Sequence, residues 1–449
     1  MSKWESNEEI QLFREYLRIP SVQPNVDYEP CVSFLKKQAA ALNLPISVCF
    51  PGNEKCPVII MSWKGLNSDL PSIMLNSHMD VVPVDENRWT HPPFAADIDE
   101  NGRIFGRGTQ DMKSIGMLYL AAIRALKRDG KQLKRTIHVT FVPDEEIGSE
   151  FGMKAFVKSN EFKALNVGFV LDESCAYPLN KVLVFYAERR QLAIELICEG
   201  QAGHGAFIQE NTPGEKVQYM INKLMGLRKS EADRLKQNPE LKPGDVTAIN
   251  LTILKGGQQI NVVPNEMSIS FDIRLAIDVN HNDFEEQLQQ WCDEAGGGIT
   301  IKILLNDPEA SITKIDHTNP YWVAFESAMK DLNLDFETIV CPGCTDARYL
   351  RQLNLPALGF TPLPNTPIKL HDNDEFVDAD VYLNGINVYM KMMLFKLQTP
   401  MSWRSRVDIL STKNACYCCC RFITLATHKQ FHNFTSFYTI HILLTSNEM

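Results

Sequence analysis

Apolar runs of strand length alternate with helical patterns over the first 180 residues of the chain. An amphipathic pattern at the start places Ile10, Phe13 and Leu17 on one helical face. A further helix is expected from Asp111, in the N-cap position, to Gly130, which closes it. Because continuous apolar strands separated by helices are typical of sheets covered on both faces, this part is predicted to be an α/β domain with a largely parallel sheet. The predicted strands are 45–50, 57–63, 71–78, 135–142 and 166–173.

The pattern changes between residues 184 and 305, where apolar and polar positions alternate with a period of two. The sequence TPGE at 212–215 has the form of a capping box with proline at N1, so a helix is expected to begin there. Strand and helix patterns follow in the order β-α-β-β-α-β, which is the ferredoxin-like arrangement. The α/β pattern resumes from 306 to 397. Residues 184–305 are therefore predicted to form a small α+β domain inserted into a larger α/β domain made of residues 1–183 and 306–397.

The tail from 398 to 449 shows neither period. Its CYCCC sequence at 416–420, followed by His428 and His432, suggests a small zinc module. However, only seven residues separate Cys420 from His428, whereas zinc fingers usually place about 12–15 residues there. The favoured interpretation is a disordered or isoform-specific extension.

Composition narrows the possible partners. A net charge of −10 argues against nucleic acid, because binding phosphates needs a basic face. No apolar run reaches the roughly 20 residues of a membrane helix, and the start of the chain has no apolar signal core, so no membrane association is predicted. Cysteines scattered singly through apolar segments are typical of reduced core thiols. We therefore expect a cytosolic protein.

Five segments of the larger domain each carry side chains that can bind a metal ion, at the end of a predicted strand or in the loop that follows. The carboxyl ends of neighbouring strands are where an α/β sheet assembles a binding site. Taken singly, these residues have ordinary explanations, such as a helix N-cap for Asp111 or solvated charge for the adjacent glutamates. As a set they indicate one site. The candidates are His78, Asp111, Glu145, Glu146, Glu173 and His371.

The kinds of donor restrict the ion. Two imidazoles and several carboxylates suit Zn²⁺, Co²⁺ or Mn²⁺ better than Ca²⁺ or Mg²⁺, which prefer oxygen alone. The absence of cysteine from the set argues against a closed structural zinc site. Two metals that share one carboxylate would leave room for a bridging hydroxide.

Nine motifs between residues 8 and 396 resemble, in the same order, a family of dinuclear zinc exopeptidases and amidohydrolases. This family includes carboxypeptidase G, acetylornithine deacetylase and the succinyl-diaminopimelate desuccinylases, and the segments WTHPPF and TIHVTFVPDEE favour the aminoacylases within it. The motifs are NSHMDVVP, GRGTQDMK, FVPDEEIG, VLDE, GHGAF, NVVP, FDIR, TDARYL and LHDNDE. The resemblance implies a zinc exopeptidase-like fold, with the larger domain holding the metals and the inserted domain serving as a dimerisation or lid domain.

The resemblance also implies roles for individual residues. It implies that His78, Asp111 and Glu173 hold one zinc ion, and that Asp111, Glu146 and His371 hold a second, with Asp111 bridging. Asp80 would orient the His78 imidazole. Glu145 would be the general base, which takes a proton from the bridging water and delivers it to the departing amine.

In the inserted domain, His204 lies in a glycine-flanked turn, and the family uses such a histidine to stabilise the oxyanion in the active site of a dimer partner. This chain reads GHGAF where GHAS is expected, and an ordinary turn histidine is the alternative. Asn261 and Arg274 are candidates for binding the substrate carboxylate, although Arg274 could also be a solvent-exposed strand residue. The remaining candidates for lining the site, at a helix N-terminus that favours anions, are Thr345, Asp346 and Arg348.

The activity implied is zinc-dependent hydrolysis of small-molecule N-acyl-L-amino acids by a homodimer. A metal-dependent dipeptidase or carboxypeptidase that uses the same centre is the alternative enzyme. A catalytically silent scaffold is a third hypothesis, but it predicts a missing ligand or base, and none of the expected residues is missing.

Overall fold

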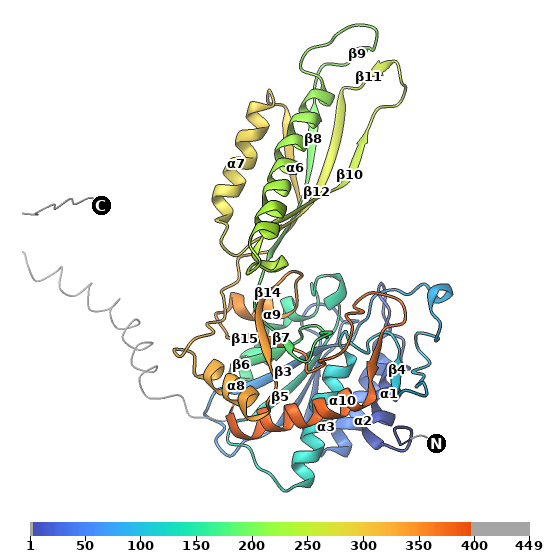
Figure 1. Cartoon of the computed structure of the whole chain (residues 1–449), viewed down its shortest axis with the longest axis vertical. Helices are drawn as coiled ribbons and strands as arrows, with labels where there is room; N and C mark the ends of the chain where they lie inside the picture. The colour runs from blue at the N-terminus through green and yellow to red at the C-terminus, as the bar shows by residue number, and fades with distance from the viewer. Residues whose placement is uncertain (1–2, 397–449) are drawn as a thin grey trace, which may run out of the picture. The chain divides into compact units, whose positions relative to one another are not determined.

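A computed structural model describes residues 3–396, and the predicted tail at 398–449, with its cysteines, lies outside the described residues. The larger domain is built on an eight-stranded sheet with the order β1-β2-β5-β3-β6-β15-β7-β14 (Figure 1). In that order, the strands are Ile46–Cys49, Val58–Trp63, Ile137–Val142, Ser72–His78, Val167–Asp172, Ala357–Phe360, Val182–Glu188 and Phe336–Cys341.

The centre of this sheet is parallel. Strand β3 pairs in parallel with β5 and β6, β6 pairs in parallel with β15, and β7 with β14. The pairs β1–β2, β2–β5 and β7–β15 are antiparallel. Every residue of β3 and β5 is buried, as expected for strands that read as continuous apolar runs. The predicted mixed, mostly parallel sheet is confirmed.

Helices cover both faces of the sheet. On one face, α3 packs against β3 and against α1 and α10, and Figure 1 shows α3 and α10 side by side. On the other face, α4, α5 and α9 contribute to a core cluster with residues of β2, β3 and β6. The helices of this domain are α1 Glu8–Leu17, α2 Glu29–Ala41, α3 Lys113–Arg128, α4 Met153–Phe156, α5 Asn160–Ala164, α8 Pro320–Asp331, α9 Ala347–Gln352 and α10 Ala379–Lys391. A π-helical turn at Met392–Lys396 extends α10.

One predicted helix boundary is wrong. Helix α3 begins at Lys113 with Met112 in the N-cap position, so Asp111 does not cap it. The Asp111 side chain contacts two histidines, as described below. At the other end, Gly130 adopts a φ of +68° just beyond the helix, as a closing glycine should.

The inserted domain has the predicted β-α-β-β-α-β order. Its antiparallel sheet has the order β10-β12-β8-β13, and one face of this sheet packs on α6 and α7 around the buried residues Ile269, Phe271 and Ile273. Helix α6 begins with the predicted capping box of Thr212 and Glu215. The elements are β8 Arg190–Glu199, α6 Pro213–Gln237, β10 Ala248–Gly256, β12 Glu266–Leu275, α7 His281–Glu294 and β13 Ile299–Asn306.

The first domain boundary needs a correction. The predicted start at 184 falls inside β7, which pairs with β14 and β15 of the eight-stranded sheet. The four-stranded sheet begins at Arg190, and Arg189 lies between the two sheets. The apolar run of β7 merges in sequence with the alternating pattern of β8, which hid the boundary.

Two short antiparallel pairs complete the description. Strand β9 (Gly203–His204) pairs with β11 (Val262–Val263), and β4 (Arg103–Phe105) pairs with β16 (Phe376–Asp378). Within residues 3–396, no helix has both the length and the apolar character that crossing a membrane requires.

Candidate metal centre

Three neighbouring parallel strands deliver acidic and histidine side chains to the same edge of the large sheet. His78 is the last residue of β3, and Glu173 directly follows β6. Glu145 and Glu146 lie in a 3-10 turn three residues beyond the end of β5. Because β5, β3 and β6 are adjacent and parallel, their carboxyl ends meet at one edge, as the sequence predicted.

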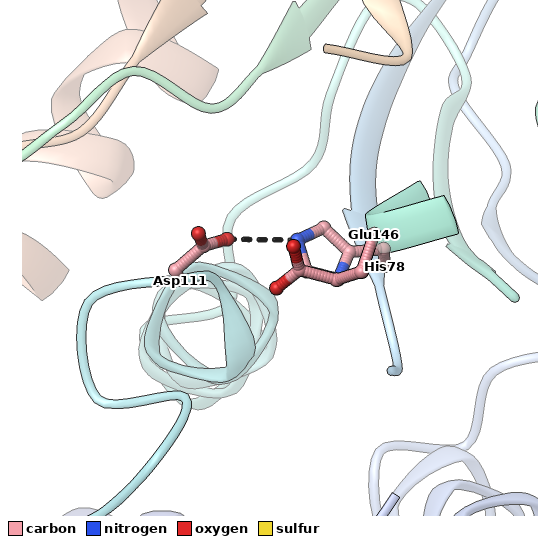
Figure 2. A group of neighbouring side chains, drawn as sticks. All are labelled: His78, Asp111 and Glu146. Atoms are coloured by element: carbon pink, nitrogen blue, oxygen red, sulfur yellow. Dashed lines mark hydrogen bonds and ion pairs between the residues drawn. The ribbon is translucent and has the colours of Figure 1, made fainter. Parts of the chain in front are cut away.

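Asp111 lies between the two histidines. Its Oδ1 is 2.9 Å from His78 Nε2, and its Oδ2 is 3.3 Å from His371 Nε2. Figure 2 shows the Asp111 carboxylate pointing at the His78 ring, with the Glu146 carboxylate beside that ring. Each oxygen of this carboxylate therefore faces a different imidazole, which is the arrangement expected of a bridging ligand.

Each histidine also has a glutamate beside it. His78 Nε2 is 3.5 Å from Glu173 Oε1, and His371 Nε2 is 3.0 Å from Glu146 Oε2. The cluster thus consists of two histidine–glutamate pairs with Asp111 between them. Glu145 belongs to the same cluster, because one of its carboxylate oxygens lies within 4.8 Å of ligand atoms of His78 and Glu173.

Burial of these carboxylates opposes their ionisation. It raises the pKa of Glu146 to about 7, with the Asp111 charge as the next cause. It also raises the pKa of Glu145 and that of Glu173 well above the usual range, and the negative charges of neighbouring carboxylates act in the same direction. The surrounding protein therefore does not fully stabilise the ionised form of these three carboxylates.

The imidazoles shift in the opposite direction. Hydrogen bonds with Asp111 and Glu146 raise the pKa of His371 to about 10. The pKa of His78 is raised well above its usual range because the nearby carboxylates outweigh its burial. Burial opposes the ionisation of Asp111, but its hydrogen bonds with His371 and His78 outweigh burial and lower its pKa.

The donor set fits divalent cations. Four carboxylates face two imidazoles, and Glu146 Oε1 is buried without a hydrogen-bond partner among the described residues. A bound cation would offset the excess negative charge, and Glu146 Oε1 would be available to coordinate it. Imidazole and carboxylate donors suit a borderline ion such as Zn²⁺.

Asp80 has a broader role than its predicted one. The Asp80 backbone carbonyl lies 2.9 Å from His78 Nδ1, whereas the Asp80 carboxylate is 3.6 Å from that nitrogen. The carboxylate instead accepts hydrogen bonds from the backbone N–H groups of Glu145 and Glu146, at 3.2 and 3.1 Å, and from Gln23 Nε2. This one residue therefore orients an imidazole and fixes the turn that carries both glutamates.

The charges of two arginines that were predicted to bind substrate, Arg274 and Arg348, both act on the Cys344 thiol. Arg274 Nη1, from β12 of the inserted domain, is 3.4 Å from Cys344 Sγ. Burial raises the pKa of the Cys344 thiol to about 11, and the charges of Arg348 and Arg274 act in the opposite direction. The pKa of Arg348 is raised because Cys344, Tyr349 and Glu145 together outweigh its burial. Both guanidinium groups also have carboxylate partners, because Arg274 Nε is 3.2 Å from Asp272 Oδ2 and Arg348 Nε is 3.5 Å from Asp307 Oδ2.

The other two residues of the TDAR segment are buried in hydrogen-bond networks. Thr345 donates through its N–H and its hydroxyl to the Glu188 carboxylate, at 2.8 Å each. Asp346 accepts from Ser149 Oγ at 2.6 Å and from Asn76 Nδ2 at 3.2 Å. These contacts fix the loop before α9, on which Arg348 lies.

The structure does not bring His204 and Asn261 to this cluster. Both are exposed and lie together, because β9 and β11 place Val262 opposite His204 and Gly205 N–H donates to the Asn261 carbonyl at 2.9 Å. His204 Nδ1 accepts a hydrogen bond from the Ala206 N–H, so the added glycine of GHGAF lies within a closed turn.

The sequence analysis missed two residues that contact candidate site residues. Cys344 Sγ lies 3.4 Å from Nη1 of the predicted Arg274, and Glu375 accepts hydrogen bonds from the loop that carries Asp111. Glu375 was inside the LHDNDE motif, but the sequence gave no sign that this acid is buried.

Comparisons with known proteins identify the family of the chain. Residues 74–394 match the model of peptidase family M20/M25/M40. The chain is 46% identical to aminoacylase-1 of Sus scrofa over 393 residues, which covers 87% of this chain and 96% of that protein. It is 40% identical to aminoacylase-1 of Dictyostelium discoideum, covering 87% of this chain and 98% of that protein.

Solved structures are similar in fold. An M20 family metallo-carboxypeptidase from Sulfolobus solfataricus superposes with a TM-score of 0.68 at 20% identity, over 87% of this chain and 99% of that one. A dinuclear metal binding peptidase of the M20 family from Bacillus subtilis gives a TM-score of 0.65 at 17% identity, over 87% of this chain and 98% of that one. The predicted family and fold class are both confirmed.

The backbone at Gly359 lies close to the backbone of Glu173, and this contact leads to a prediction about stability. A Cβ atom added to Gly359, on β15, would lie 2.2 Å from the Glu173 carbonyl oxygen. Gly359→Ala should therefore lower the free energy of unfolding by about 1–3 kcal/mol, because the backbone at Glu173 must move. The matched control is Gly226→Ala on α6, where an added Cβ meets nothing within 4 Å and should stabilise the helix slightly. Chemical denaturation checks both, and equal stability of the two variants would contradict the prediction.

Proposed function

The chain belongs to peptidase family M20/M25/M40, and on this premise we propose that it hydrolyses N-acyl-L-amino acids to a carboxylate and a free L-amino acid. The observation that carries metal-dependent hydrolysis is the Asp111 carboxylate, with one oxygen at each of two histidine–glutamate pairs. The choice of N-acyl amino acids is supported by the aminoacylase-1 relatives, which align along nearly their whole length.

Two zinc ions are the proposed cofactors. His78, Asp111 and Glu173 would hold one, and Asp111, Glu146 and His371 the other. The chemistry that these cations supply when bound is polarisation of the scissile carbonyl and a lowered pKa for the attacking water. The metal-binding character of the cluster supports this proposal, and zinc is chosen because the donors mix nitrogen with oxygen.

Glu145 is the proposed general base. It takes a proton from the attacking water and delivers it to the amine as the amide C–N bond breaks. Its backbone is fixed by Asp80, and its carboxylate lies beside His78 and Glu173 without an ion pair of its own among the described residues. A carboxylate in this position reaches the reaction centre while remaining free to move a proton.

Arg274 and Arg348 are the proposed partners of the substrate carboxylate. Both act on the Cys344 thiol, and the Arg348 charge also reaches Glu145. A guanidinium matches a carboxylate in charge and geometry, and an N-acyl amino acid carries such a carboxylate.

We assign His204 to the active site of a partner subunit, in a homodimer formed through the inserted domain. The residues around His204 support this, because Phe207, Ile208, Ile260 and Val262 are all exposed apolar side chains. Such a patch is typical of an interface. His204 would donate to the oxyanion, with Asn261 beside it.

A cytosolic location is proposed as well. The eight cysteines among the described residues are all free thiols, in agreement with a reducing compartment.

Substrate choice separates the proposed function from its alternative. The protein should release acetate from N-acetyl-L-methionine faster than it cleaves an unblocked dipeptide, and removal of metal by a chelator should abolish both activities. Initial rates with a panel of N-acyl amino acids and dipeptides check this. Clearly faster cleavage of dipeptides would favour the dipeptidase alternative, and full activity after verified metal removal would overturn the mechanism.

The variant Glu145→Ala tests the proposed role of Glu145 as the general base. The rate should fall by about 10²–10⁴-fold, because the proton transfer loses its carrier. Bound metal should remain, since the ligand set is intact. Glu150→Ala is the matched control, because this exposed glutamate pairs only with Lys154 among the described residues. Retained activity in Glu145→Ala would remove the residue from the mechanism.

Mixed dimers test the assignment of His204. A His204→Ala chain and a Glu145→Ala chain should each be inactive alone, and mixing them should restore activity. One site of each heterodimer then combines an intact Glu145 with an intact His204 from its partner. No recovery in a verified heterodimer would show that the histidine does not act across subunits.

A further inference from the structure

A buried glutamate joins the two loops that carry Asp111 and His371. These residues are 260 positions apart in the chain, and His371 lies on the loop between β15 and β16. Glu375, four residues after His371, has no exposed surface. Its carboxylate is directed at the segment that ends in Asp111.

The Glu375 carboxylate accepts hydrogen bonds from five donors of that segment. They are Arg107 Nη1 at 2.8 Å, Gly108 N at 3.2 Å, Thr109 Oγ1 at 3.2 Å, Gln110 N at 2.6 Å and Asp111 N at 3.3 Å. The backbone adds a further link, because Gly106 N–H donates to the Glu375 carbonyl at 3.0 Å. One side chain thus binds the whole turn that presents Asp111.

The Gln110 side chain connects the same two loops in the opposite direction. Its Nε2 donates to the carbonyls of Pro367 and Phe376, at 3.1 and 2.8 Å, and its Oε1 accepts from Lys369 N–H at 2.9 Å. We call these contacts of Glu375 and Gln110 the seam. The seam fixes where the loop carrying His371 lies relative to Asp111.

The two halves of the proposed metal centre differ in what holds them. His78 ends a buried strand and Glu173 follows another, so the large sheet positions that half. His371 has no strand behind it; its backbone has a φ of +60° and its side chain is 55% exposed. Its 3.3 Å separation from Asp111 Oδ2 therefore depends on the seam.

We propose that Glu375 is a positioning residue that builds the half of the centre formed by Asp111, Glu146 and His371. This inference rests on the proposed two-metal function and assigns to Glu375 the geometry of one of its two sites. A carboxylate is required, because an amide in its place would turn an NH₂ group towards N–H donors or towards the Arg107 guanidinium. The other half shares Asp111, but the sheet positions its other two residues, His78 and Glu173, so it depends less on Glu375.

Metal titration tests the proposal. Co²⁺ is titrated into the metal-free full-length chain, and the affinity of each equivalent is measured by competition with a chromogenic chelator. Glu375→Gln should retain one tight equivalent and bind the other about 10- to 100-fold more weakly. Glu326→Gln is the matched control, because this glutamate pairs only with Lys330 on the surface of α8 among the described residues, and it should bind as the wild type does.

A double variant separates positioning from a general loss of structure. His371→Ala should weaken the same equivalent, and combining it with Glu375→Gln should weaken metal binding no further, because both changes affect one site. Glu375→Asp, which keeps the acceptor oxygens, should recover part of the affinity. If Glu375→Gln does not fold, Gln110→Met carries the same expectation, because it breaks the seam and leaves the Arg107–Glu375 ion pair in place.

The outcomes distinguish the inference from the proposed function. Wild-type protein that binds fewer than two equivalents would overturn the two-metal centre itself. The role of Glu375 alone would be overturned if the wild type binds two equivalents of Co²⁺ and the seam variants either bind both as tightly or bind both equally more weakly. Additive losses in the double variant would do the same.

Discussion

Carboxylates that are removed from water at one edge of a sheet repel each other, and the larger domain is organised around this repulsion. Asp111, Glu145, Glu146 and Glu173 converge there, and burial opposes the ionisation of each. Only Asp111 gains enough from the imidazoles to have a lowered pKa. A divalent cation bound at this edge would offset this repulsion.

Buried ion pairs one layer further out fix the loops around this edge. Arg107 pairs with Glu375 behind Asp111, and Arg351 pairs with Glu188 behind Thr345. Pairs of this kind add little net stability, but removing one partner costs about 3–5 kcal/mol because a charge is left buried and alone. Their main effect is therefore on position, because they hold in place the polar loops that carry the candidate site residues.

The sequence predicted the parts of the site that are determined by strands. His78 and Glu173 end buried apolar runs, so their place at the sheet edge follows from strand length and parallel pairing. Asp111 was correctly grouped with the two histidines, but the expectation that it caps α3 is wrong, because the helix begins at Lys113 with Met112 in the N-cap position. Glu375 was missed because nothing in the LHDNDE segment shows that this acid is buried. Its burial depends on contacts with a segment about 265 residues away. The start of the inserted domain was misplaced because β7 and β8 are nearly continuous in hydrophobic pattern.

The adjacent glutamates show how local backbone geometry lets like charges share a site. Asp144 and Gly148 both have positive φ, at 54° and 102°, and they enclose a single 3-10 turn. The backbone N–H groups of Glu145 and Glu146 both donate hydrogen bonds to the Asp80 carboxylate, which fixes the turn. From this turn Glu146 pairs with His371 and also lies near His78 and Asp111, while Glu145 lies near His78 and Glu173. Both carboxylates therefore share His78, but among the described residues only Glu146 has an ion pair, so the two adjacent glutamates enter one cluster with different partners.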